Sequence, residues 1–175
     1  KVELNARNYV CFLVSLRLFG KWHVPIALKR KRLHLVATIP SFRVIVFHSQ
    51  SDHITFENCH LESENGSYGY YAELIQAEPV STNYFTLSNS YMLGGTYGVY
   101  LKGSSVGTEI RNNVFRDQSQ AMIYLESHSA PVIELNDMRT NYSGVEGMWI
   151  RLCGAKLRIQ RNLIYCRDNS DGGIY

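Results

Sequence analysis

Aromatic and charged side chains recur at matching positions of successive short apolar segments, a combination suited to carbohydrate binding. Aromatic faces stack on the apolar faces of sugar rings, and charged groups bond to hydroxyl or uronate groups. One predicted outward column holds Glu73, Tyr100, Tyr124 and Arg151, and its neighbour holds Tyr71, Gly98, Met122 and Trp149. Lys102 and Glu126 flank these columns. The predicted glycan contacts are Tyr71, Glu73, Tyr100, Tyr124, Trp149 and Arg151.

Short apolar strands must position these side chains. Their predicted bounds are 70–74, 97–101, 121–125, 148–152 and 172–175. Successive side chains of a strand point to opposite faces, so inward apolar residues leave the residues between them in water. The residues taken as inward are Ala72, Val99, Ile123 and Ile150, with Leu74, Leu101, Leu125 and Leu152.

A second repeated unit lies between these strands and carries an Asn at a fixed position. The units start at Thr55, Thr86, Ile110, Ile133 and Ile159, and their Asn residues are Asn58, Asn89, Asn113, Asn136 and Asn162. These Asn residues are separated by 31, 24, 23 and 26 positions. Asn tolerates a left-handed backbone, and its carboxamide satisfies backbone groups, so stacked Asn residues suit the tight turn of a solenoid.

The repeat predicts an all-β fold, a right-handed parallel β-helix in which each coil buries its apolar face on the next. We expect about five coils over residues 42–175, cut off at the C-terminus so that further coils or domains of the same protein are partners. Residues 1–41 are expected to form an irregular N-terminal capping segment or a first irregular coil.

Over residues 42–175 this pattern resembles the parallel β-helix repeats of the pectate-lyase-like superfamily. The resemblance implies contact with polysaccharide but no single activity, because the scaffold carries lyases, hydrolases, epimerases, adhesins and phage tail spikes. The paired Asp, Gly-His-Gly and Arg-x-Lys of polygalacturonase-like hydrolases do not occur here.

The β-helix type of alginate and chondroitin lyase offers a closer comparison. Leu101-Lys102-Gly-Ser, then 111–115 and 119–125, are similar to the segments of those lyases that carry a catalytic Lys, an Asn-x-Phe unit and a Leu-Arg-His. The resemblance makes Lys102 the candidate Brønsted base. Glu126 stands where that family has its catalytic Arg, and residues 97–100 replace its calcium-binding acidic pair, so the sequence gives no support for Ca²⁺.

Composition and spacing argue against several other classes of function. The net charge of +3 arises largely from the run 29–32, so nucleic-acid binding is not expected. The apolar stretch 9–19 is too short to span a membrane. No Cys or His spacing matches a metal site, and no cofactor is predicted. Cys153 and Cys166 lie in successive coils, and the sequence is compatible with a disulfide between them or with two buried free thiols.

The leading hypothesis is a carbohydrate-recognising β-helix module of an extracellular or cell-surface protein, which binds a glycan on an exposed aromatic strip. One alternative is a polysaccharide lyase or glycoside hydrolase whose catalytic groups are incomplete in this chain. The other is a structural spacer, which predicts high thermal stability and no ligand.

Overall fold

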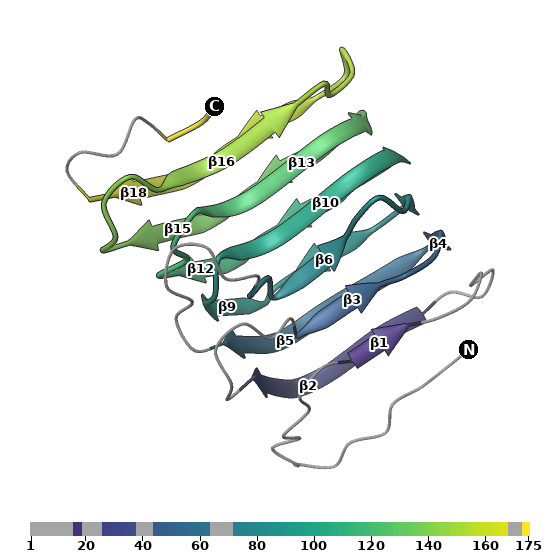
Figure 1. Cartoon of the computed structure of the whole chain (residues 1–175), viewed down its shortest axis with the longest axis horizontal. Coiled ribbons are helices and arrows are strands. Elements are labelled where there is room, and N and C mark those ends of the chain that lie inside the picture. The colour runs from purple at the N-terminus through teal and green to yellow at the C-terminus, as the bar shows by residue number, and fades with distance from the viewer. Residues whose placement is uncertain (1–15, 19–25, 38–43, 64–71, 168–172) are drawn as a thin grey trace.

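The computed structural model describes residues 16–18, 26–37, 44–63, 72–167 and 173–175, the first two ranges as backbone strands. All regular secondary structure within these residues is β-strand, and the strands pair in parallel. Figure 1 shows the strands stacked rung upon rung between the N-terminal (purple) and C-terminal (yellow) ends. The all-β parallel solenoid predicted from the sequence is therefore confirmed.

A six-stranded sheet forms one side of the solenoid, in the order β1-β3-β6-β10-β13-β16. Each strand comes from the next turn of the chain, so residues about one coil apart become neighbours. The strand bounds are Leu16–Leu18 (β1), Ile45–Phe47 (β3), Ile75–Ala77 (β6), Tyr97–Val106 (β10), Ala121–Ser129 (β13) and Glu146–Arg151 (β16).

The remaining sides belong to a ten-stranded sheet that divides into two arms at β5. β5 (Ile54–Ser63) bends at Asn58, whose φ is 56°, and its two halves pair with different strands. The first arm continues with β8 (Thr86–Ser88), β11 (Glu109–Arg111), β14 (Val132–Glu134) and β17 (Arg158–Gln160). The second continues with β9 (Tyr91–Gly94), β12 (Val114–Arg116), β15 (Asp137–Thr140) and β18 (Leu163–Cys166).

Strands before residue 44 extend the same sheets. β1 pairs with β3, and β2 (Ile26–Ala37) pairs with β5. A small two-stranded sheet of β4 (Ser51–Asp52) and β7 (Thr82–Asn83) lies at another corner. The division of the chain at residue 41 stays a prediction.

The core consists of columns of apolar side chains that run through successive coils. Leu101 and Leu125 are fully buried and in register, and so are Ile110 and Ile133. Burying such a side chain stabilises the fold by roughly 1.5–3 kcal/mol. Because each strand is short, this stabilisation depends on the coil above and below.

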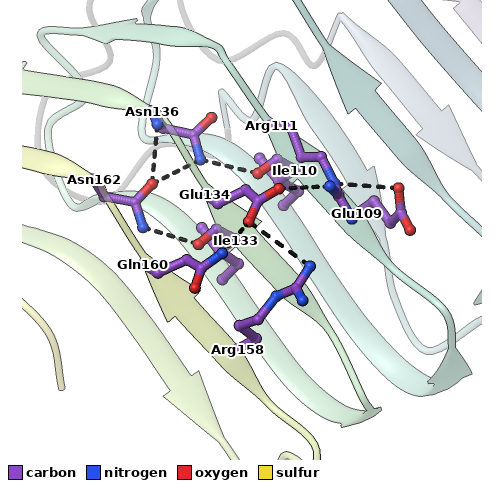
Figure 2. A network of polar contacts seen from close by, with 9 residues as sticks. All are labelled: Glu109, Ile110, Arg111, Ile133, Glu134, Asn136, Arg158, Gln160 and Asn162. Atoms are coloured by element: carbon purple, nitrogen blue, oxygen red, sulfur yellow. Dashed lines mark hydrogen bonds and ion pairs between the residues drawn. The ribbon is translucent and has the colours of Figure 1, made fainter.

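A buried polar ladder accompanies these columns at the corner between the two arms. The Asn136 backbone N–H donates to Asn162 Oδ1 at 3.0 Å, and the Asn113 N–H donates to Asn136 Oδ1 at the same distance. The Nδ2 of each carboxamide also donates to a backbone carbonyl of the preceding coil, as Asn136 Nδ2 does to Ile110 O at 2.9 Å (Figure 2). The ladder satisfies buried backbone groups at a bend where the strand pairing is interrupted.

The predicted register of this ladder is wrong in its first two coils. Ser90, not Asn89, occupies the position that aligns with Asn113: its N–H donates to Asn113 Oδ1, and its Oγ accepts from the Cys59 N–H. Cys59 therefore occupies the same position one coil earlier. Asn58 and Asn89 lie one position earlier, at the left-handed corner residue. Between Ser90 and Asn113 the coil spacing is therefore 23 residues, where the aligned Asn residues gave 24.

Candidate functional site

The outer face of the six-stranded sheet carries a continuous row of aromatic rings. We define the aromatic row as Tyr100, Tyr124, Trp149 and Tyr175, which come from β10, β13, β16 and the segment 173–175. Consecutive ring centroids are 4.6, 5.7 and 5.4 Å apart. This spacing follows from pairing in register, because neighbouring strands lie about 4.8 Å apart.

The rings are not equally accessible. Tyr124 is only 6% exposed, since its ring stacks on Tyr100 with 22° between the planes and Trp149 covers its other side. Tyr97 adds an edge contact to Tyr124 with ring centroids 6.0 Å apart. Tyr175, by contrast, is 72% exposed. Tyr124 therefore supports the row from within, and its neighbours form the accessible surface.

A charged row runs beside the aromatic row, two residues further along each strand. Lys102, Glu126 and Arg151 lie in register on β10, β13 and β16. Lys102 Nζ lies 3.0 Å from Glu78 Oε1, and Arg151 Nη1 lies 3.9 Å from Glu126 Oε2. Tyr124 OH donates to Glu126 Oε2 at 2.5 Å, which ties the two rows together.

The electrostatics of this face favour neutral phenols and a protonated lysine. Burial, followed by the negative charge of Glu73, raises the pKa of Tyr97 to about 12. Burial and the carboxylate of Glu78 likewise raise the pKa of Tyr100. The hydrogen bond to Glu78 raises the pKa of Lys102, because it stabilises the charged ammonium.

The sequence assigned the outward columns correctly for Tyr100 and Tyr124 but wrongly on either side of them. Tyr100 pairs with Gln76, whereas Glu73 lies before β6 and is only 3% exposed. The strand predicted at 70–74 is thus three residues out of register. Tyr71 lies outside the described residues.

The C-terminal register was also wrong. Trp149 lies opposite Tyr124, and Arg151 lies opposite Glu126, so Trp149 belongs to the aromatic row itself. Met122, which was expected to face outward, is fully buried, and Leu152, which was expected to face inward, is 77% exposed. The strand predicted at 148–152 is out of register by two residues.

Sequence reasoning missed Tyr97, Tyr175 and Glu78 as members of this face. A signal for part of this was present, because apolar–aromatic–apolar triplets recur at 99–101, 123–125 and 148–150. Aligning on those triplets would have placed Trp149 beside Tyr124, where the structure has it.

A second polar row lies on the ten-stranded sheet and serves as a contrast (Figure 2). Glu134 accepts hydrogen bonds from Arg111 Nη1 and Gln160 Nε2, each at 2.5 Å, and lies 3.7 Å from Arg158 Nη2. The hydrogen bond from Gln160 lowers the pKa of Glu134, and Arg111 adds to this effect. These groups bind one another across three coils, so the row holds the coils together.

A hollow of about 620 Å³ lies away from the aromatic row, at the Asn corner. Its lining includes Asn58, Asn89, Tyr91 and Asn112. Asn112 Nδ2 donates to Asn89 Oδ1 at 2.5 Å, so these carboxamides bond to each other.

Cys153 and Cys166 are thiols in the structure, so the disulfide left open by the sequence is not formed. Within the described ranges, His, Cys, Asp and Glu side chains form no group of three that could hold a metal ion. The same ranges contain no helix of the length and apolar character that a membrane span requires.

Comparison with known proteins gives one match. A family model described as a right-handed β-helix region matches residues 41–175. No curated protein and no solved structure matches the chain.

Proposed function

This chain belongs to the right-handed β-helix family, and on that premise we propose that it is a glycan-recognising module of a secreted or cell-surface protein. Its binding surface is the aromatic row with the charged row beside it. The glycan is the partner, and it lies along the stack of coils, across the strands of the six-stranded sheet.

The observation that carries this proposal is the alignment of Tyr100, Tyr124 and Trp149 on consecutive strands. Three successive coils place an aromatic ring at the same position of the outer face, and only the middle ring, Tyr124, is buried. Each ring adds apolar surface at the repeat distance of the coils. A linear polymer of sugar rings is a ligand with matching repetition.

The aromatic and the charged residues of the site would make different contacts with a glycan. Tyr175 offers the most accessible ring surface, at 72% exposure, and it meets the half-buried Trp149 nearly at right angles, with 77° between their planes. Lys102 and Arg151, held by their carboxylates, are positioned to donate to sugar hydroxyls.

Lyase chemistry at Lys102 receives less support. A general base must lose its proton near neutral pH, but the bond to Glu78 raises the pKa of Lys102. Glu126, which stands where the similar lyases have Arg, brings a negative charge next to the place where a carboxylate substrate would lie.

Affinity electrophoresis against a panel of immobilised neutral and acidic polysaccharides tests the proposal. We expect the Tyr100→Ala/Trp149→Ala double variant to lose about five- to 150-fold in affinity, since two aromatic contacts of about 0.5–1.5 kcal/mol each are removed. Tyr165→Ala is the matched control, because Tyr165 is a 59% exposed aromatic residue on β18, outside the row.

Unchanged binding in the double variant would place the glycan elsewhere on the molecule. No binding by the unmodified protein to any polysaccharide would leave the aromatic row with a purely structural role in ladder packing.

A further inference from the structure

We propose that the aromatic row selects uncharged glycans and repels polyuronates, an inference that rests on the proposed function and names its ligand class. The distribution of charge on this face carries it. Polyuronates bring one carboxylate per sugar, so their binding depends on cations that the protein leaves available.

The described cations of the charged row already have carboxylate partners. Lys102 bonds to Glu78 at 3.0 Å, and Arg151 lies 3.9 Å from Glu126. Arg151 also bonds to Tyr124 OH, which raises the pKa of Arg151. A uronate would have to displace these fixed carboxylates or lie beside them, and either arrangement places like charges together.

Further carboxylates surround the tyrosines at the β10 end of the face. Glu73 and Glu146 both act on Tyr97, where after burial they add to the rise in the pKa of its phenol. The field that disfavours a phenolate at this position disfavours a uronate in the same way. Among the described residues, the face therefore combines the carboxylates of Glu78, Glu126 and Glu146 with the cations of Lys102 and Arg151.

This acidic character is local to the face. The whole chain has a net charge of +3, and cations such as Arg111 and Arg158 lie on the other sheet around Glu134. Neutral sugars suit the aromatic row, because they present apolar ring faces to Trp149 and Tyr175 and hydroxyls to Lys102 and Arg151.

A matched pair of ligands isolates the charge. The tightest-binding neutral hexose polysaccharide of the panel is compared with the same polymer after oxidation of its primary hydroxyls to carboxylates. Calorimetric titration at low salt is expected to give at least about tenfold weaker binding for the oxidised polymer. Because screening weakens repulsion, added salt should reduce the difference in affinity between the neutral and the oxidised polymer.

A matched pair of variants locates the effect. Glu78→Gln releases Lys102 and is expected to raise the affinity for the oxidised polymer relative to the neutral one by about fivefold or more. Glu109→Gln removes the same charge from an ion pair of similar length, Arg111–Glu109 at 3.3 Å, on the other sheet. This control should leave the ratio of affinities unchanged.

Equal or tighter binding of polyuronates by the unmodified protein overturns this inference, while glycan binding itself stands. An equal change of the ratio in Glu78→Gln and Glu109→Gln also overturns it, because the selectivity would then reflect net charge. No binding to any polysaccharide overturns the proposed function, and this inference with it.

Discussion

Tyr100 and Tyr124 lie face to face on neighbouring strands, with ring centroids 4.6 Å apart and 22° between their planes. No sugar ring fits between two stacked side chains at that distance, so a ligand must lie across the edges of the row and against its less covered members. The contact also connects binding to stability, because Tyr124 is part of the packed structure.

Tyr124→Ala is therefore predicted to act mainly on stability. Its side chain is 6% exposed, and its removal leaves a gap between Tyr100 and Trp149. We expect a loss of about 2–4 kcal/mol in the free energy of unfolding, measured by urea denaturation. Tyr165→Ala, at a 59% exposed position, should cost less than about 1 kcal/mol. Equal losses in the two variants would show that the row does not pack as a unit.

The Asn ladder gives a second prediction. Asn136 is 2% exposed and supplies partners for the Asn113 N–H and for Ile110 O. Asn136→Ala leaves both buried groups unsatisfied and should lower the free energy of unfolding by about 2–4 kcal/mol.

Asn112→Gly is the control for this ladder. Asn112 lies one position before the ladder residue Asn113 and has a φ of 53° that Gly adopts readily. Its side chain donates to the exposed Asn89, and a Gly there would keep the backbone hydrogen bond to Glu134 O. We expect a change below about 1 kcal/mol. A larger cost at Asn112 than at Asn136 would contradict the assigned register.

Most of the architecture could be predicted from the repeat, but the residue of each coil that takes the inward ladder position could not. Asn58 and Asn113 serve different purposes, one as the left-handed corner and the other as the inward acceptor. Asn suits both positions for related physical reasons, so the sequence alone does not distinguish them. In the first two coils Cys59 and Ser90 take the inward position, and there the pattern misleads.

The candidate site shows the same limit. Alternation predicted the outward direction of Tyr100 and Tyr124 correctly, because Val99 and Leu101 are buried on either side of the first. Pairing between coils depends on loop lengths, however, and no local rule fixes how many residues a loop takes up. The partners Gln76 and Trp149 could therefore be assigned only from the strand register.

Acid sensitivity should arise from His128, which is 1% exposed and bonds through Nδ1 to Thr108 Oγ1 at 2.7 Å. Burial lowers the pKa of His128 to about 4. Between about pH 6.5 and pH 4 the unfolded chain therefore binds a proton that the folded chain excludes, so stability falls as the pH falls. The full effect is about 3 kcal/mol.

Urea unfolding of the protein and of His128→Gln at several pH values between 7 and 4.5 measures this effect. The variant lacks the titrating group, so its stability should decline less steeply over this range. Parallel declines for the two proteins would assign the acid sensitivity to other groups.

Gly98 limits the packing behind the aromatic row. A Cβ at this position would lie 2.6 Å from Phe115 Cδ1 and 2.7 Å from the Met122 carbonyl oxygen. Gly98→Ala should displace β10 and lower the free energy of unfolding by about 1–3 kcal/mol. Gly154→Ala, whose nearest neighbour would be 3.6 Å away, should be tolerated. Similar thermal unfolding temperatures for the two variants would contradict this packing.

The fluorescence of Trp149 tests glycan binding at the aromatic row most directly. The chain contains two Trp residues, so Trp22→Phe leaves Trp149 as the only indole. Titration with the polysaccharide that affinity electrophoresis selects should change the intensity or the emission maximum of Trp149 saturably, with the same dissociation constant as the calorimetric titration. A polysaccharide that binds by calorimetry without changing the emission of Trp149 would contradict the assignment of the site.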